Sequence, residues 1–250
     1  MAQLEADYLA DPAAFVSEGL GQFRADLETY ASIEVVEAVM GKGQTTIPYD
    51  DNYHHFMFVD PAGGSGQDSA ALCVARAVPT INTASGKDFR MAEVCLVVEY
   101  RPKFRSSAVV EDIVRIADEY HIAKIHGDNF SGGMFASNLK DAAPHIVYTI
   151  SESTKSVLYR KFLPLMTGLR VKLPDNKMSP IGQRILDQII SLETTGDGKV
   201  DAAGGAPEDV ANVVAGACVI ASEAPISDYS VDVVRKQYGR VVPPFDTNND

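Results

Sequence analysis

The sequence has few of the features that would mark a membrane, disulfide-bonded or nucleic-acid-coating protein. No apolar run approaches the roughly 20 residues that a membrane-spanning helix requires. The three cysteines, Cys73, Cys95 and Cys218, lie in apolar surroundings without a Cys-x-x-Cys spacing, which favours buried free thiols in a reducing compartment. Lys and Arg total 22 against 34 Asp and Glu, and the net charge of −12 argues against a protein that simply coats DNA.

Two further absences concern catalytic motifs. The segment Gly41–Thr46 lacks the GxxxxGK[ST] spacing that cradles phosphates, so we expect this chain neither to bind nor to hydrolyse ATP. The histidines show no metal-ligand spacing, and no Ser/His/Asp or Cys/His motif is recognisable. His126 is expected to be a strand residue and not a general base.

The basic residues are concentrated in one part of the acidic chain. Residues 155–184 hold seven basic residues and one acidic residue. Two interpretations stay open: a solvated helix face, or a track that binds DNA phosphates. The residues of this candidate DNA-binding track are Lys155, Arg160, Lys161, Arg170 and Lys172.

The pattern of apolar residues predicts an α/β order. Three strands that can pair as an antiparallel meander are followed by alternating helices and strands. The expected strands are 54–60, 69–78, 91–100, a short one ending at 128, and 145–150. The expected helices are 12–27, 33–40, 106–120, 132–142, 153–167, 178–193 and 207–222, with a glycine-rich loop at 196–206.

Three carboxylates stand at the ends of these elements. Asp60 and Asp128 each end an apolar strand, and Asp209 opens the last apolar helix. Together they could form a cage of oxygen ligands for Mg²⁺ or Mn²⁺, and two such ions roughly 4 Å apart would clamp a phosphodiester. Each residue alone could equally be a turn or cap residue. Helical spacing places Asp209 beside the apolar face and directs Glu208 to solvent.

The order and the motifs resemble the ribonuclease H-like nuclease domain of the large terminase subunit of tailed bacteriophages. The resemblance spans most of residues 10–222. It rests on the segments 58–64, 125–129, 155–159, 168–174 and 208–217. It implies an α/β, ribonuclease H-like fold with a central mixed sheet flanked by helices. The expected division is an N-terminal helical segment or linker (1–45), the nuclease domain (46–224) and a frayed or disordered tail (225–250).

The same resemblance implies a function. It is metal-dependent cleavage of double-stranded DNA during viral genome packaging, with two Mg²⁺ or Mn²⁺ ions. The implied catalytic and metal-binding residues are Asp60, Asp128 and Asp209, with Asp68 or Glu208 as a further candidate ligand. The implied partners are double-stranded DNA, a packaging ATPase domain, the portal and the small terminase subunit, in the cytoplasm of the bacterial host. This chain resembles an isolated nuclease fragment of that system.

Two alternatives to this function stay open. One is another ribonuclease H-like nuclease, such as a junction resolvase. The other is a non-catalytic packaging or scaffold module with a degenerate site.

Overall fold

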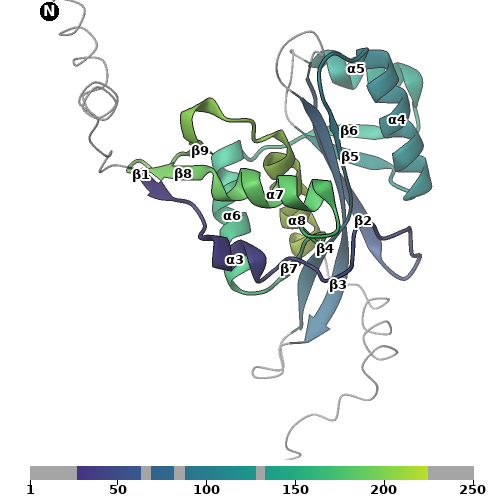
Figure 1. Cartoon of the computed structure of the whole chain (residues 1–250). Coiled ribbons are helices and arrows are strands. Elements are labelled where there is room, and N and C mark those ends of the chain that lie inside the picture. Colours follow the sequence, from purple (N-terminus) through teal and green to yellow (C-terminus); the bar gives the residue numbers. More distant parts are fainter. Residues whose placement is uncertain (1–26, 63–68, 82–87, 128–132, 225–250) are drawn as a thin grey trace, which may run out of the picture.

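A six-stranded mixed sheet forms the centre of the computed structural model, which describes residues 27–62, 69–81, 88–127 and 133–224 (Figure 1). The strand order is β6-β5-β2-β3-β4-β7. The strands are β2 (His54–Asp60), β3 (Ala70–Ile81), β4 (Asp88–Tyr100), β5 (Lys124–Gly127), β6 (Val147–Ile150) and β7 (Val171–Lys172). β2, β3 and β4 pair antiparallel, β5 runs parallel to β2, and β6 and β7 each run parallel to their neighbours. The predicted meander and the mixed sheet are therefore confirmed.

Helices cover both faces of this sheet (Figure 1). α4 (Ser106–Glu119) and α5 (Met134–Ala142) lie on one face. The other face carries α3 (Ile33–Glu37), α6 (Lys155–Thr167), α7 (Pro180–Ile190) and α8 (Asp209–Glu223). None of the described helices combines the length and apolar character needed to span a bilayer.

Side chains of β2 enter both cores in alternation. Met57 and Val59 belong to the core under α4 and α5, whereas Phe58 belongs to the core under α8. This is the period of two that a strand imposes, and a strand buried on both faces reads as a continuous apolar run. Asp60 follows Phe58 by two residues and so belongs to the α8 face.

A second, three-stranded sheet was not predicted. β1 (Leu27–Thr29), β8 (Leu192–Thr195) and β9 (Val200–Ala202) pair in the order β1-β8-β9, and the 3₁₀ turn η3 (Ala203–Gly205) follows. The expected helix 178–193 ends at Ile190, and the expected glycine-rich loop contains β9. The reason is the turn between β8 and β9, where Gly198 adopts φ +79° and closes an antiparallel hairpin.

The N-terminal part of the described chain packs on the α8 side. Tyr30, Val36 and Val39 are buried in the same core as α8. The expected helix 33–40 is shorter and ends at Glu37, while Leu27 begins a strand. Residues 12–26 of the expected first helix and the expected tail 225–250 lie outside the described residues. The division of the chain at residues 45 and 224 stays a prediction.

Helix α8 approaches β2 unusually closely. A Cβ at Gly216 would lie 2.5 Å from ring atoms of Phe58, so glycine is required there. Asn212 lies four residues earlier on α8, and Asp60 lies two residues later on β2. The four residues from Asn212 to Gly216 span about 6 Å along the helix, and the two residues from Phe58 to Asp60 span about 6.6 Å along the strand. Asn212 therefore comes to lie beside Asp60 when Gly216 lies beside Phe58. The Phe58–Gly216 contact therefore sets the position of the N-terminal end of α8 over the end of β2.

We expect Gly216→Ala to lower the free energy of unfolding by up to about 2 kcal/mol. Alanine favours a helix interior by about 1 kcal/mol, but an overpacked core costs about 1–3 kcal/mol. The matched control is Gly196→Ala, because a Cβ there meets nothing within 4 Å, and a change within about 0.5 kcal/mol is expected. Urea unfolding of both variants checks this. Equal stability of the two would mean that α8 does not press on Phe58.

Candidate active site

The ends of two neighbouring strands meet at one edge of the sheet. β2 and β5 are parallel, with Val59 opposite Gly127. Asp60 follows Val59 as the last residue of β2, and Asp128 follows Gly127 in the sequence. Asp128 itself lies outside the described residues, as does Asp68. The described residues thus bring the end of β5 beside Asp60.

Gly127 is required by this close packing. A Cβ at that position would lie 2.2 Å from the carbonyl oxygen of Val59 and 2.4 Å from Tyr148 Oη. The Tyr148 ring in turn meets Phe135 of α5 edge-on, with 5.2 Å between ring centroids. The residue before the second predicted carboxylate therefore has to be glycine for the strand ends to come together.

A buried amide orients the Asp60 carboxylate. Asn212 is fully buried in α8, and its Nδ2 donates a hydrogen bond of 2.7 Å to Asp60 Oδ2. The bond joins residues 152 positions apart. Sequence reasoning missed Asn212, although it is the one strongly polar side chain inside the apolar run 210–221. A fully buried polar residue needs a partner, and that requirement was the available signal.

Asp209 stands on the first turn of α8, one turn before Asn212. It is the first helical residue and is half-buried. Residues three apart on a helix are neighbours on its surface, so Asp209 and Asn212 share a side of α8. Because Asn212 contacts Asp60, we expect Asp209 to lie close to the end of β2. Negative charge is also favourable at a helix N-terminus.

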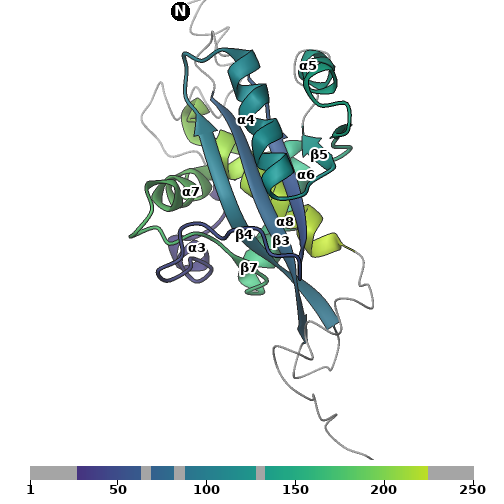
Figure 2. The same ribbon diagram turned by 90° about the vertical axis from the view of Figure 1, so that its right-hand side faces the viewer.

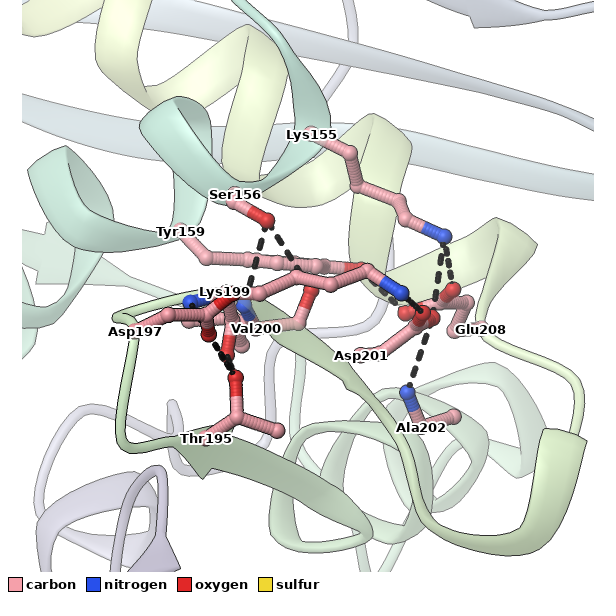
Figure 3. A network of polar contacts seen from close by, with 10 residues as sticks. All are labelled: Lys155, Ser156, Tyr159, Thr195, Asp197, Lys199, Val200, Asp201, Ala202 and Glu208. Atoms are coloured by element: carbon pink, nitrogen blue, oxygen red, sulfur yellow. Dashed lines mark hydrogen bonds and ion pairs between the residues drawn. The ribbon is translucent and has the colours of Figure 1, made fainter. Parts of the chain in front are cut away.

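Glu208 is mostly buried, so the expectation that its side chain points into solvent was wrong. Its side chain is only 13% exposed; it forms an ion pair with Lys155 and accepts a 3.2 Å hydrogen bond from Tyr159 Oη (Figure 3). Glu208 is the N-cap of α8 with φ −136° and ψ 9°, so the angular spacing of helical residues does not apply to it. In addition, α8 is buried on nearly all sides and not along one apolar face.

Charged residues continue this network toward β9 (Figure 3). Lys155 Nζ also lies 3.3 Å from Asp201 Oδ1, and Lys199 Nζ lies 2.6 Å from Asp201 Oδ2. The hydrogen bond from Lys199 holds the pKa of Asp201 well below its usual value. Burial raises the pKa of Glu208, and the bond from Lys155 offsets this only in part. Glu208 is therefore a desolvated carboxylate that depends on Lys155 for its charge balance.

The other residues of the candidate DNA-binding track also have partners within the chain. Arg160 donates a 3.0 Å hydrogen bond to the carbonyl of Gly198 in the β8–β9 turn, and Lys161 pairs with Glu223 at 2.9 Å. With Lys155, these residues attach α6 to β9 and α8. Their binding of DNA stays a prediction.

Arg170 and Lys172 lie far from Asp60. Lys172 of β7 pairs with Glu93 of β4, and Glu93 pairs with Arg76 of β3. Arg76 in turn pairs with His55 of β2, which is five residues before Asp60. At about 3.3 Å per residue this row lies about 17 Å from the Asp60 row. Lys172 pairs with Glu93 at 2.8 Å. The five predicted basic residues therefore do not form one continuous track along the edge that carries Asp60.

Two smaller expectations are confirmed. Cys73, Cys95 and Cys218 are buried free thiols. His126 is a strand residue of β5, half-buried opposite Phe58, and burial lowers its pKa.

The donor chemistry at the edge fits a hard divalent cation. Carboxylate oxygens are the ligands that Mg²⁺ and Mn²⁺ prefer, and Asn212 already fixes the orientation of Asp60. Within residues 27–62, 69–81, 88–127 and 133–224, no three His, Cys, Asp or Glu side chains gather as a metal-binding group. These ranges contain Asp60 and Asp209 and omit Asp128 and Asp68.

Comparison with solved structures identifies the fold as that of large-terminase nuclease domains. The large-terminase nuclease of thermophilic phage G20c matches with a TM-score of 0.54 at 18% identity, over 74% of this chain and 95% of that one. A magnesium-bound structure of that nuclease matches with a TM-score of 0.52 at 18% identity, over 74% of this chain and 94% of that one. The large-terminase nuclease domain of Thermus phage P74-26 matches with a TM-score of 0.54 at 16% identity, over 76% of this chain and 94% of that one.

The HK97 bacteriophage large terminase matches with a TM-score of 0.53 at 13% identity, over 87% of this chain and 49% of that one. No family model and no curated protein matches the sequence. At these identities the likeness concerns the fold. It confirms the predicted ribonuclease H-like α/β architecture and the resemblance to terminase nuclease domains.

We expect Lys155→Met to lower the free energy of unfolding by about 1–3 kcal/mol at pH 8. Breaking a buried ion pair costs about 3–5 kcal/mol, and the 35% exposure of the Lys155 side chain reduces that figure. The variant raises the pKa of folded Glu208 further above its unfolded value. The loss of stability is therefore complete above the pKa that Glu208 has in the folded variant. It disappears as the pH falls below the pKa that Glu208 has in the unfolded chain.

The double variant Lys155→Met with Glu208→Gln is the matched control, because it removes both charges. We expect it to recover most of the lost stability at pH 8. Urea unfolding of both variants at pH 4 and pH 8 measures the effect. A double variant as unstable as the single one would show that Lys155 acts by packing and not by charge.

Proposed function

We propose that this chain is a metal-dependent endonuclease that cleaves double-stranded DNA during viral genome packaging. One observation carries the proposal: Asn212 holds Asp60 at the edge where β5 also ends. Asp209 stands one turn before Asn212 on α8, and we infer that it faces the same edge. The fold around this edge is that of terminase nuclease domains, one of which has been seen with magnesium. A rigid set of carboxylates in this fold is suited to phosphodiester hydrolysis.

The residues that would hold two Mg²⁺ or Mn²⁺ ions are Asp60, Asp128 and Asp209. When bound, such ions supply charge stabilisation on the phosphodiester and lower the pKa of a water molecule. Asn212 keeps the Asp60 carboxylate oriented from within the core. Lys155 balances the charge of Glu208, so that this fourth carboxylate does not add its repulsion to the other three.

The partners proposed for this activity follow from the packaging system. They are double-stranded DNA, a packaging ATPase domain, the portal and the small terminase subunit, in the cytoplasm of the host bacterium. This chain spans 49% of the HK97 large terminase. A backbone-directed nuclease of this kind would cut without strong sequence preference, because phosphate contacts carry no base information.

We expect Asp60→Asn to abolish nicking of a supercoiled plasmid in Mg²⁺ or Mn²⁺ while the fold persists. The substitution keeps the shape and an oxygen that Asn212 can bond, but it removes the charge that would bind the cations. The wild-type chain should cut in either metal and stop in EDTA. Asp141→Asn, on the exposed surface of α5, is the charge-matched control and should cut like the wild type.

The outcomes separate the alternatives. Metal-dependent nicking by Asp60→Asn at the wild-type rate would refute the assignment of Asp60 as a catalytic metal ligand. A folded wild-type chain that neither cuts DNA nor binds Mn²⁺ would indicate a non-catalytic packaging module. Cleavage confined to four-way junctions would indicate a resolvase.

We expect Asp209, and not Glu208, to be the third ligand. Glu208 is occupied by Lys155 and Tyr159, whereas Asp209 shares the side of α8 that carries Asn212. Calorimetry of Mn²⁺ binding and plasmid nicking should both show loss in Asp209→Asn and retention in Glu208→Gln. The reverse pattern would exchange the two roles.

A further inference from the structure

The loop that follows β4 presents three cations in alternation. Arg101, Lys103 and Arg105 are exposed, while Pro102 and Phe104 between them are half-buried. This alternation gives the loop an outer basic side and an inner anchoring side. The loop lies outside the basic stretch 155–184 that the charge distribution singles out.

The loop stands at the same edge of the sheet as Asp60. Asp60 lies opposite Ala71 of β3, and Ala71 lies opposite Glu99 of β4. Two strand spacings of about 4.8 Å place Glu99 about 10 Å from Asp60 along the edge. Arg101 follows two residues later, and the chain then enters α4 at the same end of the sheet (Figure 2).

Contacts at both ends of the loop hold it in place. Glu99, whose side chain is 5% exposed, accepts hydrogen bonds of 3.0 Å from Arg101 and 2.8 Å from Arg184 of α7. The Phe104 ring meets the Tyr100 ring edge-on at 6.5 Å. Tyr100 Oη donates a 2.7 Å hydrogen bond to Asp112 of α4. The cations therefore project from a fixed base, which lowers the entropy cost of binding a ligand with them.

Lys103 and Arg105 differ from three lysines of the stretch 155–184. Lys155, Lys161 and Lys172 each pair with a carboxylate. Neither Lys103 nor Arg105 forms an ion pair with any residue in the described ranges. In a chain of net charge −12, two exposed cations without an acidic partner among those residues are a local positive field beside an acidic site.

We propose that the Arg101–Arg105 loop binds the sugar-phosphate backbone of duplex DNA beside the position of cleavage. The inference rests on the proposed nuclease function and deepens it. Glu99, which precedes the loop, lies about 10 Å from Asp60. That distance corresponds to about three base pairs at a rise of 3.4 Å, and the loop cations follow Glu99 by two to six residues. Lys103 and Arg105 are positioning residues: they hold the DNA in register, and the contacts carry no sequence information. Arg101, which pairs with Glu99, anchors the start of the loop.

The test compares two double variants of equal charge. Lys103→Ala with Arg105→Ala removes the loop cations. The control, Lys124→Ala with Lys140→Ala, removes two exposed lysines at the start of β5 and near the end of α5. Both are made in the Asp60→Asn background, so that the DNA stays intact. Fluorescence anisotropy with a labelled duplex in Mg²⁺ gives the affinity over a series of salt concentrations.

We expect the loop variant to bind more weakly and to reduce the slope of log affinity against log salt by about 1 for each lost contact. The control should keep the slope of its parent. In the chain with Asp60 restored, the loop variant should raise KM for plasmid nicking and leave kcat unchanged. A purely structural role of the loop would not alter the salt slope.

Two results would overturn the proposal in distinguishable ways. A loop variant with the slope, affinity and KM of its parent, in a chain that cuts DNA, refutes the loop contact and leaves the nuclease function standing. A wild-type chain that neither binds nor cuts duplex DNA refutes the nuclease function, and the loop proposal fails with it.

Discussion

The site depends on how closely α8 can approach β2. Gly216 lets the helix backbone come within reach of the Phe58 ring, and the small residues Ala211 and Ala215 are also fully buried. One turn toward the helix N-terminus, the same register puts Asn212 against Asp60 at 2.7 Å. A bulkier residue at 216 would lift the helix and break a buried hydrogen bond, leaving an unsatisfied amide at a cost of about 1–3 kcal/mol. Packing in the core and alignment at the site are thus one constraint.

The same constraint explains why charged groups are buried at the start of α8. Because the helix is covered on nearly all sides, its N-cap residue Glu208 cannot extend into water. Lys155 and Tyr159 of α6 satisfy its two oxygens, and Asp201 of β9 joins through Lys155. A buried pair of this kind adds little net stability compared with apolar residues, but removing one partner is costly. Its effect is to fix α6 and β9 against the helix that carries Asp209.

The sequence was enough to predict elements whose periodicity spans the whole element. The run ending at Asp60, the helix from Ser106 and the long apolar helix were found within a few residues of their true ends. The second sheet was missed because strands of three or four residues are stabilised by their pairing and not by their own composition. β7, with two residues, carries no periodic signal at all. The partner of Asn212 was also inaccessible, since it lies 152 positions away.

Charge gave the least reliable guide to the site, for a physical reason. A count along the chain finds the basic stretch 155–184, but pairing in space decides which charges act on a ligand. Glu223, Glu93 and Glu208, each more than 45 positions from its partner, neutralise lysines of that stretch. The exposed pair Lys103 and Arg105 contributes only two charges to the sequence, yet no described carboxylate pairs with either. Long-range attraction of a polyanion follows the unpaired charges, because closely paired ones largely cancel beyond a Debye length of about 8 Å. An acidic protein can therefore hold DNA at one edge, provided that its free cations and its bound metal ions gather there.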